Sequence, residues 1–370
     1  MVSEKLKYRI ALTQIKGVGP VLARNLVAYL GSEEAVFKEK ATALQKIPGI
    51  GPVLANDIAS AEVMERTERE LKFIVGKNIK PVYFTDPEYP QRLNNCDDAP
   101  VVLYTLGEHD LNARRILSIV GTRKITEEGK LNCEKLIDGL SQMFPNLLVV
   151  SGLAYGVDIW AHRQSLKHGL PTIGVLAHGL DRIYPPMHRQ TAVEMLANGG
   201  LVTEFMSETG PDKPNFVRRN RIIAGMADAV IVVESGVKGG ALITATLASS
   251  YNRDVLAFPG RVGDPMSAGC HWLVKHNVAA LVENHEDVAN ALGWESERKG
   301  ESTVQAKLFV EFGSDEEQRI YQFMLQERET DINWLCIRCN LPVSKVSSVL
   351  LGFEFDGLVK SLPGNKFRLI

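Results

Sequence analysis

The sequence has 370 residues, of which 45% are hydrophobic and 23% charged, so the chain can bury a large core, and its length indicates about two or three domains. Its 42 basic and 44 acidic residues nearly cancel, so any surface that binds an anion has to be local. No apolar run reaches the length of a membrane span, and five scattered cysteines argue against a disulfide framework. We therefore expect a cytoplasmic protein without a membrane segment.

Residues 1–77 are predicted to form a mildly basic helical module with an internal repeat. The segment Ile15–Ala23 (IKGVGPVLA) recurs as Ile47–Ala55 (IPGIGPVLA). Each copy places two glycines in a tight turn and a proline where the next helix begins, which is typical of a helix-hairpin-helix whose turn presents backbone N–H groups to a phosphate. Close helix packing would use glycine in the same way. The candidate secondary DNA contacts are Gly17, Gly19, Gly49 and Gly51.

Residues 78–293 are predicted to form a Rossmann-like α/β domain. Short apolar runs of strand type alternate there with helical stretches, which is typical of a mostly parallel sheet covered on both faces. We expect strands at 101–104, 116–120, 147–150, 172–176 and 230–233, with weaker candidates at 256–258 and 280–282. We expect helices between them at 127–143, 156–168 and 188–197.

The last part of the chain is predicted to be a linker, residues 294–313, followed by a winged helix, residues 314–370. Three short helices at 315–326, 332–339 and 344–355 precede a hairpin at 359–369 that turns at Pro363-Gly364-Asn365. The winged helix is nearly neutral in charge, whereas a domain that reads DNA is normally basic. A protein partner is therefore at least as consistent with this domain as DNA.

Ligands of α/β sheets gather beyond the carboxyl ends of the strands. Three predicted strands end in turns rich in small residues, at 121–123, 151–158 and 234–241, whose N–H groups can hold phosphate oxygens. A fourth segment, Phe216–Arg221, joins an aromatic ring to three arginines and an asparagine, which suits a phosphate backbone with a base to stack, although solvated surface can look similar. The candidate DNA contacts are Gly121, Thr122, Arg123, Ser151, Gly152, Gly156, Phe216, Arg218, Arg219, Asn220, Arg221, Lys238, Gly239 and Gly240.

Catalysis and metal binding find little support in the sequence. Asp158 and His162 would share a helix face near Ser151, but the G-x-S-x-G pattern of a nucleophile elbow is absent, so Asp158 is better explained as a residue that holds the loop. Cys336 and Cys339 have no second cysteine pair at metal spacing and fit the packed helix of a winged helix. We predict no catalytic residue, no metal site and no cofactor.

Six segments of the central region occur in a recognisable order, and they are Gly121–Arg123, Ser151–Asp158, Gly179–Pro185, Asn215–Gly225, Gly240–Ala245 and Phe258–Gly260. In sequence and order these segments resemble the signatures of the DNA-processing protein A family (DprA, also called Smf). The resemblance implies a Rossmann-like core that binds single-stranded DNA, forms a homodimer and loads RecA recombinase during the uptake of foreign DNA. It also implies a sterile-alpha-motif-like helical domain and a winged helix on either side of that core. His271 and Asn277 depart from the asparagine and glycine that the family leads us to expect.

Two other functions compete with this interpretation. A nucleotide-processing enzyme of the lysine-decarboxylase-like phosphoribohydrolase type would share the fold and a glycine-rich phosphate turn. The comparable segment here, Lys238–Ala245, lacks the proline and the downstream glutamate of that enzyme motif. A transcription factor that binds double-stranded DNA through the winged helix is disfavoured by the charge of that domain.

For assembly, we expect a two-fold dimer that uses Gly269–Val282, where apolar and polar residues alternate.

Overall fold

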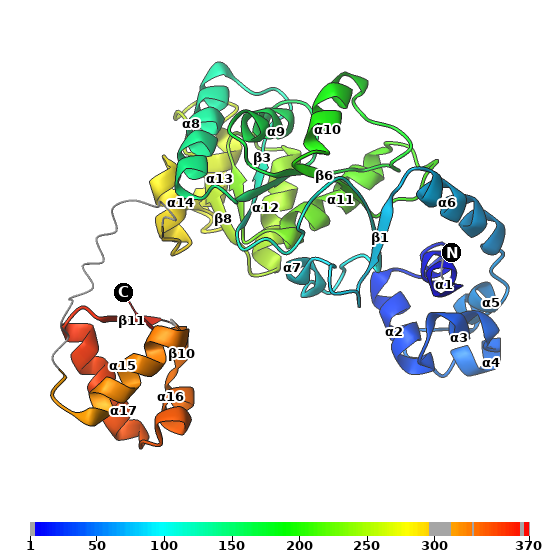
Figure 1. The fold of residues 1–370 in the computed structure, drawn as a ribbon. Helices are drawn as coiled ribbons and strands as arrows, with labels where there is room; N and C mark the ends of the chain where they lie inside the picture. The colour runs from blue at the N-terminus through cyan, green and yellow to red at the C-terminus, as the bar shows by residue number, and fades with distance from the viewer. Residues whose placement is uncertain (1–3, 296–311, 328, 363–365, 370) are drawn as a thin grey trace. The chain divides into compact units, whose positions relative to one another are not determined.

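The computed structural model describes residues 4–295, 312–327, 329–362 and 366–369 (Figure 1). The chain divides into two compact units, Met1–Glu297 and Arg298–Ile370. Most of the predicted linker and the Pro363-Gly364-Asn365 turn lie outside the described residues. Each unit is described by itself below.

The first unit begins with a helical module in which the two sequence repeats adopt the same backbone. Gly17 and Gly49 have positive φ angles of 78° and 86°, a conformation that glycine adopts without steric cost. Gly19 and Gly51 cap the following helices with extended backbones, and a proline opens each of these helices. The predicted helix-hairpin-helix is thereby confirmed. The helices are α1 (Glu4–Leu12), α2 (Pro20–Leu30), α3 (Glu33–Lys38), α4 (Ala41–Leu44), α5 (Pro52–Ala59) and α6 (Met64–Gly76).

A nine-stranded sheet forms the centre of the first unit, in the order β1-β2-β6-β5-β4-β3-β7-β8-β9. The neighbours from β6 to β9 pair in parallel, whereas β1 and β2 pair antiparallel at one edge, which confirms the mostly parallel sheet. The strands are β1 (Lys80–Tyr83), β2 (Val102–Leu106), β3 (Ile116–Val120), β4 (Leu148–Ser151), β5 (Thr172–Val175), β6 (Gly199–Thr203), β7 (Ala229–Val232), β8 (Asp254–Ala257) and β9 (Ala280–Leu281).

Helices cover both faces of this sheet, and the alternation of side chains along β3 shows how. Ile116 and Val120 point into one apolar cluster with α11 and α12, while Leu117 and Ile119 point into another with α8 and α9. Ser118, on the α11 face, donates a hydrogen bond to the Ile223 carbonyl at 2.7 Å. The remaining helices of the unit are α7 (Gln91–Asn94), α8 (Glu127–Met143), α9 (Val157–Lys167), η1 (Pro186–His188), α10 (Arg189–Met195), α11 (Lys213–Met226), α12 (Gly240–Ser250), α13 (Ala268–Lys275) and α14 (His285–Ala291).

The helical module packs against the antiparallel edge of the sheet. Tyr83 of β1 and Tyr104 of β2 are buried in the apolar cluster of the module. Glu70 of α6 is 2% exposed and accepts a hydrogen bond from the backbone N–H of Ser207 at 3.0 Å. The Nη1 atom of Arg9 lies 3.0 Å from Asp86. Module and sheet are therefore joined by buried apolar surface and by ionic contacts.

The second unit is a winged helix, as predicted. Three helices pack on the sheet β10-β12-β11, and Cys339 is buried in their shared core. The sequence did not predict β10, because three residues with the polar sequence Glu-Thr-Asp carry no strand signal. The elements are α15 (Asp315–Glu327), β10 (Glu329–Asp331), α16 (Ile332–Cys339), α17 (Val343–Phe355), β11 (Val359–Leu362) and β12 (Lys366–Leu369).

Candidate nucleic-acid interface

The three turns singled out in the sequence lie side by side, because β4, β3 and β7 are neighbours in the sheet. The backbone N–H of Thr122 donates to the Glu234 carbonyl at 2.7 Å, which joins the turn after β3 to the turn after β7. The N–H of Val157 donates to the Thr122 carbonyl at 3.1 Å, which adds the turn after β4. One connected surface thus forms at the carboxyl edge of the sheet.

Several of the predicted glycines bring these turns together and are not open phosphate cradles. Gly156 has a φ of 79°, and a Cβ placed there would lie 2.0 Å from the Thr122 carbonyl oxygen. A Cβ at Gly152 would lie 2.4 Å from Nη1 of Arg219. A Cβ at Gly121 would lie 2.4 Å from Val157. Glycine is needed at these positions for close approach of chain segments.

The turn after β7 is more open. Gly240 begins α12, and a Cβ there would have no neighbour within 4 Å. Gly239 caps the helix, and Lys238 before it is exposed. The first N–H groups of a helix have no partner inside the helix. This turn therefore keeps the form that the sequence predicted for a phosphate contact.

Arg219 and Ser151 depart from the prediction, because both are buried. Arg219 is 3% exposed, and its Nη1 donates to the carbonyls of Gly152, at 2.6 Å, and Val175. Burial lowers the pKa of Arg219 to about 10, so the guanidinium stays charged at neutral pH. Ser151 is fully buried and donates to the Ile119 carbonyl at 2.6 Å. Both residues hold the turn after β4 in place and are not positioned to touch DNA.

Arg218 and Arg221 share one carboxylate but differ in exposure. The side chain of Arg218 is 57% exposed, and its Nη2 lies 2.9 Å from Oε2 of Glu204. The side chain of Arg221 is 9% exposed, and its Nη2 lies 2.5 Å from the same oxygen. Asn220 is partly buried and accepts a hydrogen bond from Arg219 at 3.3 Å. Of the four residues Arg218–Arg221, Arg218 is thus the one whose charged group is largely exposed, while it is paired with Glu204.

Beside the turn after β3, aromatic rings gather around Arg123. The guanidinium carbon of Arg123 lies 5.2 Å from the centroid of the Phe216 ring, and the Tyr184 ring lies 6.1 Å from Phe216. Tyr155 and Tyr184 are 41% and 42% exposed. These four side chains line a narrow cleft, which we call the aromatic cleft. Exposed rings next to an arginine form a surface on which bases can stack while a phosphate is neutralised.

The sequence did not identify Tyr155 and Tyr184 as contacts. Both lie inside the family signatures Ser151–Asp158 and Gly179–Pro185, so their positions carried a signal. Their exposure depends on how the turns after β4 and β5 fold against α11. An aromatic residue in a glycine-rich turn beyond a strand end is the feature that could have found them.

Ser151 and His162 do not form a catalytic pair. His162 is fully buried, and its Nδ1 lies 2.7 Å from Oγ1 of Thr172. Burial lowers the pKa of His162 to about 3, so the imidazole is neutral at physiological pH. Burial raises the pKa of Asp158, and the charge of Arg219 opposes this rise. These groups form a buried polar core under α9.

The carboxylate of Glu234 also has hydrogen-bond partners within the fold. It is 7% exposed and accepts a 2.9 Å hydrogen bond from the backbone N–H of Thr126 and another from its hydroxyl. Thr126 in turn caps α8 by accepting from the N–H of Gly129. Glu234 thereby fixes the start of α8.

Within residues 4–295 and the described parts of the winged helix, no cluster of three or more His, Cys, Asp or Glu side chains is arranged to hold a metal ion.

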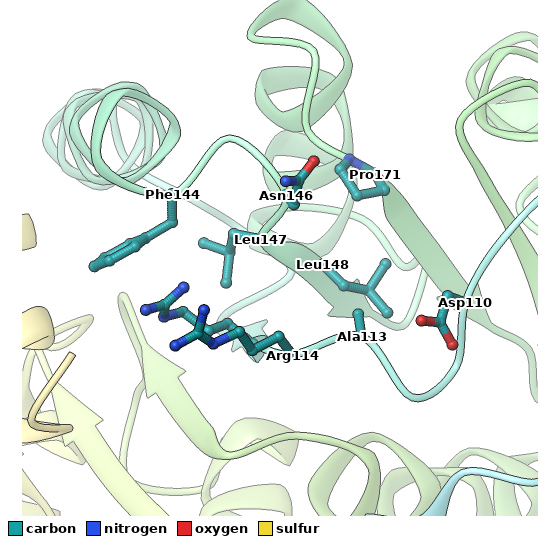
Figure 2. Close-up of a pocket in the computed structure, with 9 residues that line it drawn as sticks. Asp110, Ala113, Arg114, Phe144, Asn146, Leu147, Leu148 and Pro171 are labelled. Carbon is teal, nitrogen blue, oxygen red and sulfur yellow. The ribbon is translucent and has the colours of Figure 1, made fainter. Parts of the chain in front are cut away.

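A separate hollow of about 500 Å³ lies at the opposite edge of the sheet, where β3 and β4 begin (Figure 2). Figure 2 shows Arg114, Phe144 and Leu147 around it. The guanidinium carbon of Arg115 lies 4.6 Å from the centroid of the Phe144 ring and 5.6 Å from that of Trp294. Arg115 therefore helps to anchor the end of the first unit. Because ligands of such sheets gather at the carboxyl edge, we place the candidate interface there and not in this hollow.

In the part of the chain that the structure describes, no helix is both long enough and apolar enough to cross a membrane.

Family models match all three parts of the chain. Residues 80–293 match DNA recombination-mediator protein A. Residues 310–365 match the DprA winged helix domain, and residues 10–61 match a SAM-like helix-hairpin-helix tandem.

Individual proteins show the same similarity. Protein Smf of Synechocystis sp. is 35% identical over 297 residues, which is 79% of this chain and 74% of that protein. DNA processing protein DprA of Streptococcus pneumoniae is 40% identical over 207 residues, 55% of this chain and 71% of that protein.

Two solved structures resemble this one. The X-ray structure of DNA processing protein A from Streptococcus pneumoniae has a TM-score of 0.66 at 29% identity and covers 78% of this chain and 98% of its own. A structure of DNA processing protein A from Helicobacter pylori, which concerns the single-stranded DNA binding mode of that protein, has a TM-score of 0.52 at 27% identity. It covers 58% of this chain and 95% of its own.

Proposed function

Because this chain belongs to the DNA recombination-mediator protein A family (DprA/Smf), we propose that it binds single-stranded DNA at the carboxyl edge of its central sheet. The observation that carries the proposal is the aromatic cleft, where Arg123 faces the Phe216 ring beside two exposed tyrosines. Stacking on aromatic rings tolerates any base, and cations beside the rings neutralise the backbone. Arg218 of α11 and Lys238 of the turn after β7 are exposed and can meet further phosphates.

In this proposal the protein works by binding in the cytoplasm, without catalysis or a cofactor. It protects incoming single-stranded DNA and loads RecA recombinase onto it during natural transformation. The family description as a recombination mediator and the relatives' description as DNA processing proteins support this role. The side chains that a hydrolase or a phosphoribohydrolase would use, Ser151, His162 and Glu234, have structural partners here.

We also propose a homodimer and a protein partner. The dimer would use α13 and β9 at the far edge of the sheet, where Trp272 and Leu281 are 39% and 49% exposed. The winged helix would contact protein, because Ile337 and Phe355 are 69% and 84% exposed on a nearly neutral domain.

The DNA interface is tested by Arg123→Ala combined with Arg218→Ala. Each lost phosphate contact lowers the slope of log affinity against log salt by about 0.7 for single strands, so we expect the slope to fall by about 1.4. Affinity at low salt should also fall. The measurement is a titration of labelled oligonucleotides, single against double strand, across a salt series.

The matched control is Arg69→Ala combined with Lys167→Ala. These two side chains are 52% and 59% exposed and each is paired with a glutamate, so the control also removes two surface cations, on α6 and at the end of α9. We expect the control to keep the slope and the affinity of the unmodified protein. Equal losses in both double variants would show that total charge, and not this site, governs binding.

A further inference from the structure

A second hollow lies next to the candidate interface, between the helical module and the sheet domain. Its volume is about 300 Å³. The first hairpin contributes Val18, Gly19 and Pro20, and the sheet domain contributes Phe205, Asn215 and Arg218. The hollow therefore joins segments that are about two hundred residues apart in the sequence, a separation that only the fold can close.

The lining of this hollow has the chemistry of a nucleotide site. Val18, Pro20 and Phe205 give it apolar walls. The guanidinium carbon of Arg218 lies 5.3 Å from the centroid of the Phe205 ring, and the side chain is 57% exposed. The 11-residue helix α2 begins at the hollow, so its first N–H groups and its dipole favour an anion.

A buried carboxylate with one oxygen free to accept a further hydrogen bond is a second polar feature of this hollow. The side chain of Glu204 is 5% exposed and lines the hollow. Its Oε2 binds Arg218 and Arg221, whereas its Oε1 has no hydrogen-bond partner within the described residues. An unsatisfied buried oxygen is costly, and the N–H groups on the edge of a nucleobase are donors.

Helix α11 links this hollow to the aromatic cleft. Phe216 lines the cleft, while Asn215 and Arg218, within one turn of it, line the hollow. A helix with its side chains is about 10–12 Å across. A strand that passes over the start of α11 can therefore reach both sites within a few nucleotides.

The second hairpin has the same backbone but not these surroundings. None of the residues 47–55 lines the hollow, and Val53 is 76% exposed. The charges also differ between the copies, because Lys16 and Arg24 of the first correspond to Pro48 and Asn56 of the second.

From these observations we propose that the first hairpin, and not the second, forms a second nucleotide subsite with Phe205 and Arg218. A base packs between the apolar walls, and its phosphate meets Arg218 and the start of α2. This inference rests on the proposed binding of single-stranded DNA at the aromatic cleft and extends its path onto the helical module.

The repeat supplies a matched pair of variants, Gly19→Asp and Gly51→Asp. Both glycines are N-caps with nearly equal angles, φ −82° and ψ 177° against φ −80° and ψ 172°, and a Cβ at either would have no neighbour within 4 Å. Aspartate is a favoured N-cap, so both variants should fold with an unchanged or raised melting temperature. Only the carboxylate at position 19 would face the hollow.

We expect Gly19→Asp to weaken binding of an oligo-dT of about 16 nucleotides by about five- to tenfold, and Gly51→Asp to leave it unchanged. Binding of the dinucleotide dTpdT, which is too short to fill both the aromatic cleft and the hollow, should be the same in both variants. Gly19→Asn, whose side chain caps α2 without a charge, should weaken binding of the long oligonucleotide less than Gly19→Asp does, because it engages the same N–H groups but does not repel the phosphate.

Equal effects of the two aspartates on the long oligonucleotide, or no effect of either, would overturn the subsite. The short oligonucleotide separates this failure from that of the proposed function. If the unmodified protein does not bind it, or if Arg123→Ala does not weaken its binding, the aromatic cleft itself is misplaced.

Discussion

Arg123 and Arg219 are both arginines of a predicted DNA site, yet the structure gives them opposite environments. Arg123 is exposed beside an aromatic ring, whereas Arg219 is 3% exposed and holds two backbone carbonyls. The sequence identified both, because an arginine near a helix entrance indicates an anion site in either case. It could not separate the residue that would touch DNA from the one that shapes the turn, since exposure depends on tertiary packing.

His162 gives a prediction at this scale. The Thr172 hydroxyl donates to the Val149 carbonyl, so Nδ1 of His162 donates to that hydroxyl. The folded protein therefore holds the imidazole in its neutral form. The pKa of about 3 lies below the usual 6.5, so the unfolded chain takes up a proton first as the pH falls. The contribution of His162 to the free energy of unfolding is fully present above pH 6.5, and about 2 kcal/mol of it should be lost by pH 5.

The measurement is urea unfolding at pH 6.5 and pH 5, with His162→Asn for comparison. Asparagine keeps an N–H donor for Thr172 but does not titrate. The variant should therefore lose less free energy of unfolding between the two pH values, and the contribution of Asp158, which has the opposite sign, cancels in the comparison. Parallel pH profiles would contradict the assignment of the buried neutral imidazole.

At the scale of elements, strands with apolar runs were predictable and strands without them were not. The runs at 116–120, 147–150 and 230–233 correspond closely to β3, β4 and β7, which position the site. Strand β6 begins with two glycines and was missed, because glycine carries no strand preference. The three glycine-rich turns were predicted, but the aromatic cleft was not, since it needs the turns after β4 and β5 to meet α11.

The turn before α9 gives a prediction for this scale. Gly156→Ala places a Cβ 2.0 Å from the Thr122 carbonyl and also strains a positive φ, so the turns after β3 and β4 must separate. Gly169→Ala is the matched control, because its φ of 73° is similar but its Cβ would meet nothing within 4 Å. We expect the control to lose about 1–2 kcal/mol of unfolding free energy and Gly156→Ala to lose more.

Oligonucleotide titration of the same two proteins distinguishes a local effect from a general one. Gly156→Ala should also weaken DNA binding, because the turn carries Tyr155 and faces Arg123. Gly169→Ala should bind like the unmodified protein. Equal losses of stability in the two variants would mean that the turns can relax around the added methyl group.

At the scale of the whole molecule, the order of helical module, α/β domain and winged helix follows from periodicity and repeats. The hollow between the first hairpin and the sheet domain does not follow from them. It depends on the contact of the module with β1 and β2 and on ties such as that between Glu70 and Ser207. Neither the surface of the helical module nor the sheet edge that it contacts carries a recognisable sequence motif.

The division of the chain predicts what each part contributes. A protein of residues 1–297 holds the aromatic cleft, the hollow and the proposed dimer surface. We expect it to bind oligo-dT within about twofold of the full chain and to remain a dimer, because the nearly neutral winged helix gains little from counterion release. Titration and sedimentation at micromolar concentration check both points, and a large loss of affinity would assign the winged helix to DNA.

Glu204 has a consequence for how a strand leaves the protein. Its carboxylate already occupies Arg218 before any phosphate arrives, so binding there exchanges one anion for another. The free energy gained is the difference between two ion pairs and is smaller than that of an empty cationic site. When the strand dissociates, the Glu204 carboxylate pairs with Arg218 again, so the guanidinium is not left without an anion. Such an exchange weakens the hold on the strand at this point, which agrees with the proposed transfer of the strand to a recombinase.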